Sequence, residues 1–243
     1  ADDPGGGGER RPTHATQVTF TLDAIAAGAV GAGPVYAEPL LVANVAISGG
    51  RHNVLFVATQ QNTVYAFDAD ASPCTTYWKV NLDPAGSTPT PNSGSQGDPD
   101  LLGPYGIFGT PVIDPSGSVL YAVASTLDNG TTFNYRLHAL DLATGAEKPS
   151  SPVVISATAG GVTFTPAVQM QRPGLLLSGS NVYVAFGSYG DANTYFGWVI
   201  GYDKTALTRT AAFNTAPNST ETNGAAIWMA GAGPAADGSR NIY

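Results

Sequence analysis

An internal repeat is the feature that most constrains the fold of this chain, because self-similarity at a fixed period determines how the repeated units must pack. Each unit has a proline near the start of an apolar strand, a polar turn that opens a second strand, and a third strand that ends in aspartate. The prolines lie 72, 62 and 61 residues apart, at Pro39, Pro111, Pro173 and Pro234. A weaker fourth strand follows each of the aspartates, which are Asp68, Asp141 and Asp203.

Four strands in each repeat predict an all-β fold, a β-propeller built from four-stranded antiparallel blades. A single blade cannot bury both of its faces, so neighbouring blades must stack. A β-sandwich is the alternative fold, but a sandwich requires no such internal period. The clearest hairpin lies within 53–70, where two apolar strands flank the polar turn 60–62.

The repeats divide the chain into a flexible N-terminal segment, residues 1–16, and a partial propeller, residues 17–243. The predicted blades span 35–82, 106–156 and 172–214, and a fourth begins over 227–243. The alternating segment 17–22 could be a further strand, with a partner distant in the sequence. Propellers close with about four to eight blades. About three and a half blades are present, so we expect a fragment, or one part of a seven- or eight-bladed ring that other polypeptide closes.

Composition and charge exclude some partners. Charged residues make up 12% of the chain, and the net charge is −8. An acidic chain without a basic patch is a poor partner for nucleic acid or for an anionic membrane surface. The apolar stretch 24–35 is too short, and too interrupted by Pro34, to span a bilayer. The polar start without methionine is what signal-peptide removal or proteolysis leaves, and we expect an exported protein.

The connection between the first two predicted blades, residues 83–105, is rich in Pro, Ser, Gly and Asp. Connections of this length without regular structure are uncommon, and disorder or passive coverage is favoured over binding. Asp98 and Asp100 in this connection are candidate ligands for Ca²⁺. Because Ca²⁺ takes about six to eight oxygen ligands, two carboxylates are too few, and a solvated loop is the favoured interpretation.

A second candidate site is the polar and aromatic stretch in the third repeat, with Tyr189, Asp191, Tyr195 and Trp198. Aromatic rings beside an acid can stack on a sugar or on a planar cofactor, although packing between blades is the favoured role. The three histidines, His14, His52 and His138, have no metal-ligand spacing, and structural roles are expected for them. Cys74 is the single cysteine, so an intramolecular disulfide is not possible.

Several stretches resemble the repeats of bacterial exported proteins with PQQ-like (quinoprotein-like) β-propellers. These are Val35–Leu40, His52–Thr59, Asn62–Asp70, Leu137–Glu147, Gln171–Leu177 and Gly231–Asp237. The resemblance covers about residues 35–243 and implies a seven- or eight-bladed propeller and export. For the quinoprotein alcohol dehydrogenases it also implies pyrroloquinoline quinone (PQQ) and Ca²⁺.

The chain departs from that family at two places. The family's docking motif often ends in a tryptophan several residues after Thr-Gly, but no tryptophan follows Thr144-Gly145, and Trp78 in the first repeat has no Thr-Gly before it. The adjacent cysteine pair of the dehydrogenases is absent, since Cys74 stands alone. The family's calcium ligands and catalytic aspartate match no position here.

Three functions follow from these patterns. We expect an exported, non-enzymatic propeller that acts as a binding or structural platform, because the repeats are strong and no catalytic constellation is visible. The alternative is a PQQ- and Ca²⁺-dependent alcohol or sugar dehydrogenase whose site lies largely outside this chain. The second alternative is a carbohydrate-binding or polysaccharide-acting propeller, suggested by the stretch from Tyr189 to Trp198. The expected partners are a small molecule or glycan, and other polypeptide that closes the ring.

Overall fold

The computed structural model describes residues 34–243 except 72, 74, 191–193 and 218–222. Its regular structure is almost entirely β-strand, and one 3₁₀ turn, Gly94–Gln96, is the sole helical element in these ranges. The predicted all-β class is therefore confirmed. The N-terminal segment 1–16, the possible strand 17–22, Cys74 and Asp191 lie outside the described residues. No described helix is long and apolar enough to cross a membrane.

The first blade is a four-stranded antiparallel sheet in sequence order. Its strands are β1 (Leu40–Ile47), β2 (Gly50–Ala58), β3 (Thr63–Asp68) and β4 (Thr76–Asn81). The predicted hairpin is β2–β3, in which Phe56 pairs with Ala66. Asn62 closes its turn with φ of 50°, a left-handed conformation that asparagine tolerates better than most residues.

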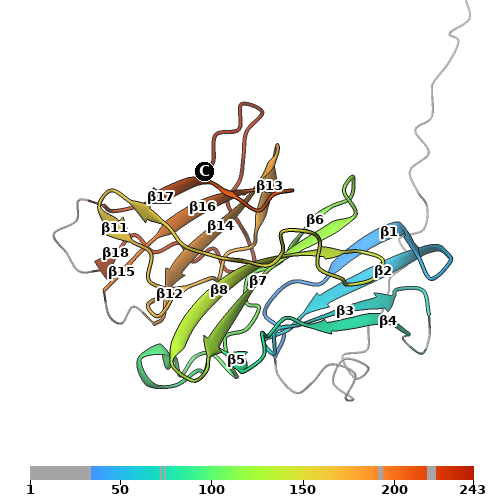
Figure 1. Ribbon diagram of the computed structural model, residues 1–243, viewed down its shortest axis with the longest axis horizontal. Helices are drawn as coiled ribbons and strands as arrows, with labels where there is room; N and C mark the ends of the chain where they lie inside the picture. The colour runs from blue at the N-terminus through green and yellow to red at the C-terminus, as the bar shows by residue number, and fades with distance from the viewer. Residues whose placement is uncertain (1–33, 72, 74, 191–193, 218–222) are drawn as a thin grey trace, which may run out of the picture.

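The second and third blades repeat this arrangement, each with one extra short strand. Blade two contains β5 (Ser87–Pro89), β6 (Val112–Asp114), β7 (Val119–Asp128), β8 (Thr132–Asp141) and β9 (Val153–Val154). Blade three contains β12 (Gln169–Met170), β13 (Leu176–Ser178), β14 (Asn181–Ser188), β16 (Trp198–Asp203) and β17 (Arg209–Asn214). Two short pairs form separate two-stranded sheets: β10 (Thr158–Ala159) with β11 (Val162–Thr163), and β15 (Tyr195–Phe196) with β18 (Asn223–Gly224). The sheets follow one another from the blue through the green to the orange part of the chain (Figure 1).

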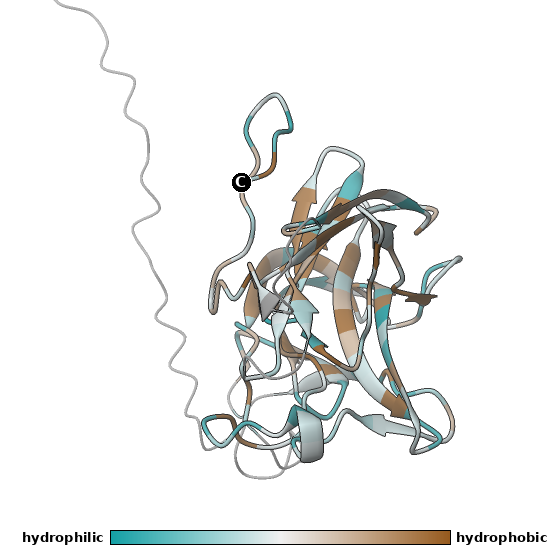
Figure 2. Ribbon diagram, turned by 90° about the vertical axis from the view of Figure 1, so that its left-hand side faces the viewer, coloured by the Kyte–Doolittle hydropathy of each residue, from teal (hydrophilic) through white to brown (hydrophobic). Residues whose placement is uncertain are grey.

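The blades stack face to face because their two longest strands are apolar on both sides. In β8, Leu137 and Ala139 pack into a core shared with blade three, while Leu140 packs into a core shared with blade one. Residues of apolar type are therefore concentrated in the strands, and hydrophilic residues are more frequent at the turns (Figure 2). Each fully buried large apolar side chain stabilises the fold by about 1.5–3 kcal/mol. The stacked antiparallel sheets are those of a β-propeller.

A tryptophan latch joins blades one and two. The Trp78 indole nitrogen donates a hydrogen bond of 2.9 Å to the carbonyl oxygen of Leu142. Its ring lies so close to Gly145 that a Cβ there would come within 2.6 Å of a ring carbon, and the Gly145 φ of 71° also favours glycine. The tryptophan and the Thr-Gly turn that appeared unmatched within their own repeats therefore meet across the interface between two blades.

The repeated prolines mark an inner wall, made of residues 36–39, 108–111, 171–174 and 231–234. Its segments are hydrogen-bonded side by side: the Glu38 amide donates to Thr110 Oγ1, at 3.0 Å, and the Gly174 amide donates to the Ala232 carbonyl, at 2.7 Å. The Leu175 amide also donates to the Thr110 carbonyl. The proline segments of neighbouring repeats thus lie side by side, at the edge opposite to β4, β9 and β17.

Candidate functional site

The two ends of the blade stack differ in what they carry. At one end, the chain passes from one blade to the next and the second and third strands of each blade join; we call it the connection end. We call the opposite end the turn end. The long connection after β4 covers the connection end and is ordered by Asn92, whose side chain donates to the carbonyls of Asp98 and Leu101. Gln96 of the same connection donates to the Ala167 carbonyl at 2.8 Å, so the connection reaches blade three. Of the two roles favoured from the sequence, disorder and passive coverage, the structure shows an ordered connection that packs as a cover.

Asp98 and Asp100 shape this cover. The Asp100 amide donates to Asp98 Oδ1 at 2.9 Å, and the Asp98 amide donates to Asn92. Burial, with a smaller contribution from the nearby Asp98 charge, raises the pKa of Tyr105. Asp98 Oδ2 lies 3.8 Å from the position of a Cβ on Gly190, so the two candidate stretches of the sequence meet here. Within the described ranges no three His, Cys, Asp or Glu side chains gather as metal ligands, and the Ca²⁺ site stays a prediction.

The aromatic candidates of the third repeat lie in two different places. Tyr189 is buried at the connection end, with its hydroxyl 2.6 Å from that of Tyr135. Trp198 is buried in the core between blades two and three, with its ring 5.8 Å from Phe164 at an interplanar angle of 87°. Tyr195 is also buried, and Asp191 lies outside the described residues. Burial of all three described rings favours packing over stacking on a ligand.

The histidines that the structure describes lie away from this end or within an interface. His138 is buried between blades one and two, and its Nδ1 lies 2.6 Å from Glu147 Oε1. The His52 ring packs against Tyr77 at a centroid distance of 5.4 Å. His14 lies outside the described residues.

An aromatic cluster fills the centre of the connection end. Tyr36 and Phe108 of the inner wall stack at a centroid distance of 4.4 Å and an angle of 19°. Tyr105 packs edge-on against Phe108 and tilts against Tyr189, at 5.4 and 5.0 Å. Leu101 and Trp228 are half-buried at the margin of the cluster. These rings form an apolar floor at the inner wall.

Arg172 is the residue of this end that the sequence patterns did not single out. Its guanidinium carbon lies 5.8 Å from the Tyr36 ring centroid and 5.9 Å from that of Phe108. Its Nη1 is buried without a hydrogen-bond partner. Burial lowers the pKa of the guanidinium from its ordinary value, but arginine stays charged in proteins. Arg172 directly precedes a repeated proline, and that position holds Glu38, Thr110 and Gly233 in the other repeats. An alignment of the repeats would therefore have placed it on the inner wall.

Buried polar atoms without partners concentrate at the connection end. In the part of the chain that the structure describes, four of the six residues with such an atom lie in this region, while His138 lies between blades one and two and Trp198 in the core between blades two and three. The four are Gln60, Asn62, Arg172 and Asn214. A buried polar atom without a partner costs about 1–3 kcal/mol, so a concentration of them calls for a functional explanation.

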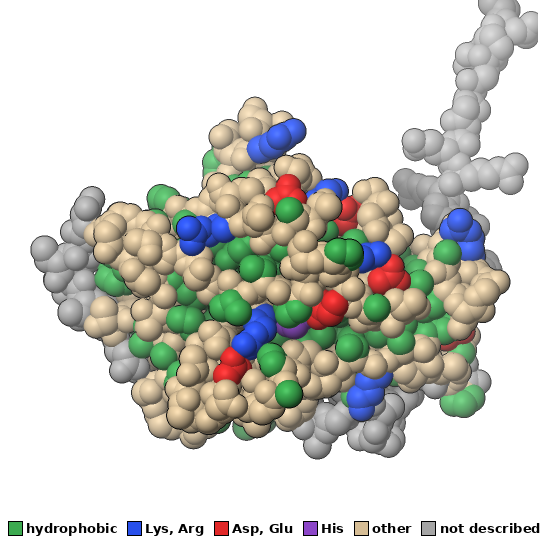
Figure 3. All heavy atoms as spheres, in the orientation of Figure 1, with side chains coloured by type: hydrophobic (Ala, Val, Ile, Leu, Met, Phe, Trp, Pro, Cys, Tyr) green, Lys and Arg blue, Asp and Glu red, His purple; other side chains and the backbone are tan. Residues whose placement is uncertain are grey.

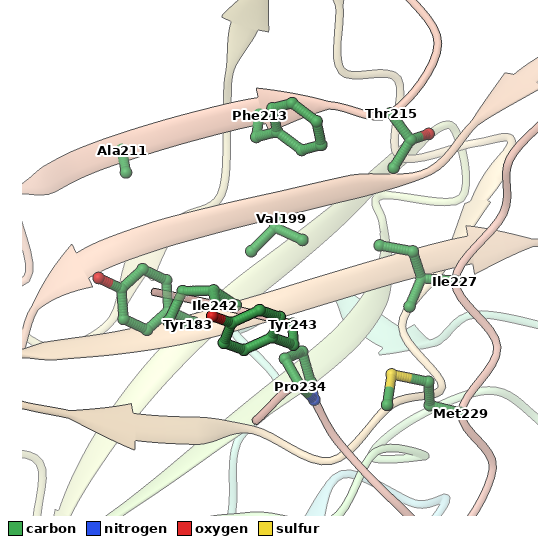
Figure 4. Close-up of a pocket in the computed structure, with 10 residues that line it drawn as sticks. All are labelled: Tyr183, Val199, Ala211, Phe213, Thr215, Ile227, Met229, Pro234, Ile242 and Tyr243. Carbon is green, nitrogen blue, oxygen red and sulfur yellow. The ribbon is translucent and has the colours of Figure 1, made fainter. Parts of the chain in front are cut away.

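Two hollows lie elsewhere. A cavity of about 590 Å³ opens on the face of blade three that points away from blade two (Figure 4). Its lining is almost entirely apolar and includes Phe213, which is 60% exposed. A second hollow, of about 630 Å³, lies between blades two and three at the turn end, and its charges are paired as Lys204–Asp114 and Lys148–Asp141, both at 2.6 Å. Charges of both signs are interspersed over the face seen in Figure 3.

No model of a known protein family matches the chain, and no curated protein matches it. Among solved structures, the chain is similar to a europium-containing methanol dehydrogenase, at 16% identity and a TM-score of 0.43, over 72% of this chain and 26% of that one. It is also similar to the quinohemoprotein alcohol dehydrogenase ADHIIG from Pseudomonas putida HK5, at 11% identity and a TM-score of 0.47, over 74% and 31%. The chain spans less than a third of the length of either protein.

The resemblance to PQQ-like propellers implies a planar, polycarboxylate quinone held with Ca²⁺, and the side chains test this implication. The connection end offers aromatic rings and one arginine, which suit a carboxylate on a flat molecule. The described residues contain no cluster of three metal-ligating side chains to hold the cation. This part of the chain therefore fits a carboxylate but does not assemble the quinone–metal pair.

Proposed function

We propose that this chain is part of an exported β-propeller that works as a non-enzymatic binding platform, with a small-molecule site at the connection end. The main observation in support of this proposal is the concentration of buried polar atoms without partners at that end, beside the aromatic cluster. A ligand that supplies hydrogen-bond partners to such atoms removes the free-energy cost of leaving them unpaired, and this favours binding. The half-buried rings of Tyr36 and Trp228 supply flat apolar contact area, which is the usual lining of small-molecule sites.

Ring closure by other polypeptide belongs to the same proposal. The outer face of blade three is apolar, and the pairing of Ala236 with Ile242 beside it closes a short turn in the fourth repeat. An exposed apolar sheet face is a surface that a further blade would cover. Intact mass and sedimentation of the natural protein test this part. A monomer whose mass matches three and a half blades, with no partner, would contradict it.

The binding site is tested by a thermal-shift screen of the purified chain against small organic acids, neutral sugars, glycans, and PQQ with Ca²⁺. A ligand at a hundred times its Kd stabilises the folded state by about 2.7 kcal/mol. For a chain of this size that corresponds to a rise in Tm of about 5–10 °C. The proposal requires at least one such ligand, with the shift abolished by Trp228→Ala or Tyr36→Ala.

Each arm of the screen separates the proposal from its alternatives. A Tm shift with PQQ and Ca²⁺, followed by oxidation of an alcohol or sugar, would replace the platform with the dehydrogenase. A shift with neutral glycans alone would favour the carbohydrate-binding alternative. If no compound shifts Tm, the connection end is a packed cover and the binding proposal fails.

A further inference from the structure

We infer that the ligand of the connection end is a small carboxylic acid, and that Arg172 is the residue that binds its carboxylate. This inference rests on the proposed binding function and names the class of ligand. It depends on the position of Arg172, on its unpaired charge, and on the residues that hold its guanidinium in place.

The guanidinium is held at the margin of the aromatic floor. Tyr36 and Phe108 are stacked on each other, and Arg172 lies at nearly the same distance, 5.8 and 5.9 Å, from both rings. Tyr36 is anchored in turn, because its hydroxyl accepts a hydrogen bond of 3.0 Å from the Leu102 amide. Cation–π contact with two fixed rings restrains the guanidinium without consuming its N–H donors. An arginine so placed is ready to bind a planar anion.

The charge of Arg172 has no counterpart in the described structure. The ion pairs of the described residues use Arg136, His138, Lys148 and Lys204 as their cations, and none of them involves Arg172. The chain has 18 acidic residues against 10 basic ones, so an unpaired, half-buried arginine is not explained by a shortage of acids. Nη1 itself is enclosed, but the side chain is partly exposed, and a ligand carboxylate that meets its accessible part supplies the missing charge.

Several features favour a single carboxylate over a phosphate or a polyanion. The inner wall has one arginine, and the equivalent positions hold one acid and two neutral residues, Glu38, Thr110 and Gly233. A phosphate dianion is usually bound by several cations or amides, whereas one guanidinium matches one carboxylate in a bidentate pair. The net charge of −8 repels a multiply charged anion more than a monoanion.

The test is isothermal titration of the purified full chain with matched pairs of acids and neutral analogues: benzoate against benzamide, and glucuronate against glucose, with inorganic phosphate as a separate anion. We expect at least one acid to bind about 10- to 100-fold more tightly than its neutral analogue, which is the effect of a hydrogen bond to a charged group. Arg172→Gln should remove that preference, and Arg172→Lys should restore only part of it because lysine lacks the planar fork.

The matched control is Arg51→Gln, which removes the same charge from an exposed residue outside the connection end. It should leave the affinity for acids unchanged. Far-ultraviolet circular dichroism and Tm check that each variant is folded. Should Arg172→Gln unfold, Arg172→Lys carries the test, since it preserves charge and bulk.

The outcomes separate the inference from the proposed function. If a ligand binds equally to wild type and to Arg172→Gln, but not to Trp228→Ala, the connection end is a binding site and the carboxylate inference is wrong. If phosphate binds more tightly than every acid, the inference is also wrong. If no compound binds to the wild type, both fail. Loss of acid binding in Arg172→Gln, with retention in Arg51→Gln, supports both.

Discussion

Two charged groups at opposite ends of the blade stack, Lys204 and Arg172, differ in their partners. At the turn end, Lys204 pairs with Asp114 at 2.6 Å, and the Tyr121 hydroxyl donates to the Lys204 carbonyl at 2.7 Å. The Trp78 indole likewise has its partner there. At the connection end, Arg172 has aromatic neighbours but no acid.

The difference shows which polar groups serve the fold. Groups that hold blades together have partners within the protein, because an unpaired buried charge destabilises the folded state. A group without a partner persists when something other than stability retains it. Under the proposed function, the Lys204–Asp114 pair serves the fold and Arg172 serves ligand binding.

The largest expected loss of stability comes from a substitution at the turn end. Gly145→Ala should destabilise the protein by about 2–4 kcal/mol, because its Cβ would overpack against Trp78 and because its φ of 71° is strained for alanine. Urea unfolding measures the change in free energy. Gly130→Ala is the control: Gly130 has a similar φ of 70° and nothing within 4 Å, so it reports the backbone strain alone. Equal costs for the two variants would contradict the latch.

The second expected effect is a pH-dependent loss of stability at the turn end. Although burial opposes it, the hydrogen bonds from Lys204 and Ser116 lower the pKa of Asp114 to about 2, from its ordinary 3.8. A depressed folded-state pKa stabilises the protein above the unfolded value, and this stabilisation is lost as pH falls through the folded value. The contribution of Asp114, about 2 kcal/mol, should therefore disappear between about pH 4 and pH 2.

Asp114→Asn isolates this contribution. At pH 6 the variant should be less stable than the wild type, and the difference should shrink as the pH approaches 2. Urea unfolding at several pH values measures both proteins. A difference that does not depend on pH would mean that the Lys204–Asp114 pair adds nothing across the interface.

The smallest expected effect concerns the connection end. Arg172→Met should change the free energy of unfolding by less than about 0.5 kcal/mol, or raise it, because methionine fills the place of the aliphatic stem without burying an unpaired charge. Loss of the contact with Tyr36 and Phe108 opposes this gain. Thermal unfolding measures it. A loss above about 2 kcal/mol would make Arg172 a structural residue and remove the contrast between the two ends.

The sequence indicated the blades more fully than the site. The repeated prolines, the polar turns and the strands ending in aspartate correspond to β-strands in three successive sheets. The same reasoning placed Trp198 among candidate ligand contacts, and the structure buries it in the core between blades two and three. The sequence patterns did not single out Arg172, because the rings that it contacts, Tyr36 and Phe108, belong to two other repeats.

The sequence by itself determined the all-β class and the repeated four-stranded unit, because alternation of side chains and turn chemistry are local properties of the chain. Only the tertiary structure decided which residues meet. It brought Trp78 to Gly145, Asp98 to Gly190, and Arg172 to Tyr36. Such contacts join segments about one or two repeats apart, and they exist only after apolar faces have stacked and set the register between blades.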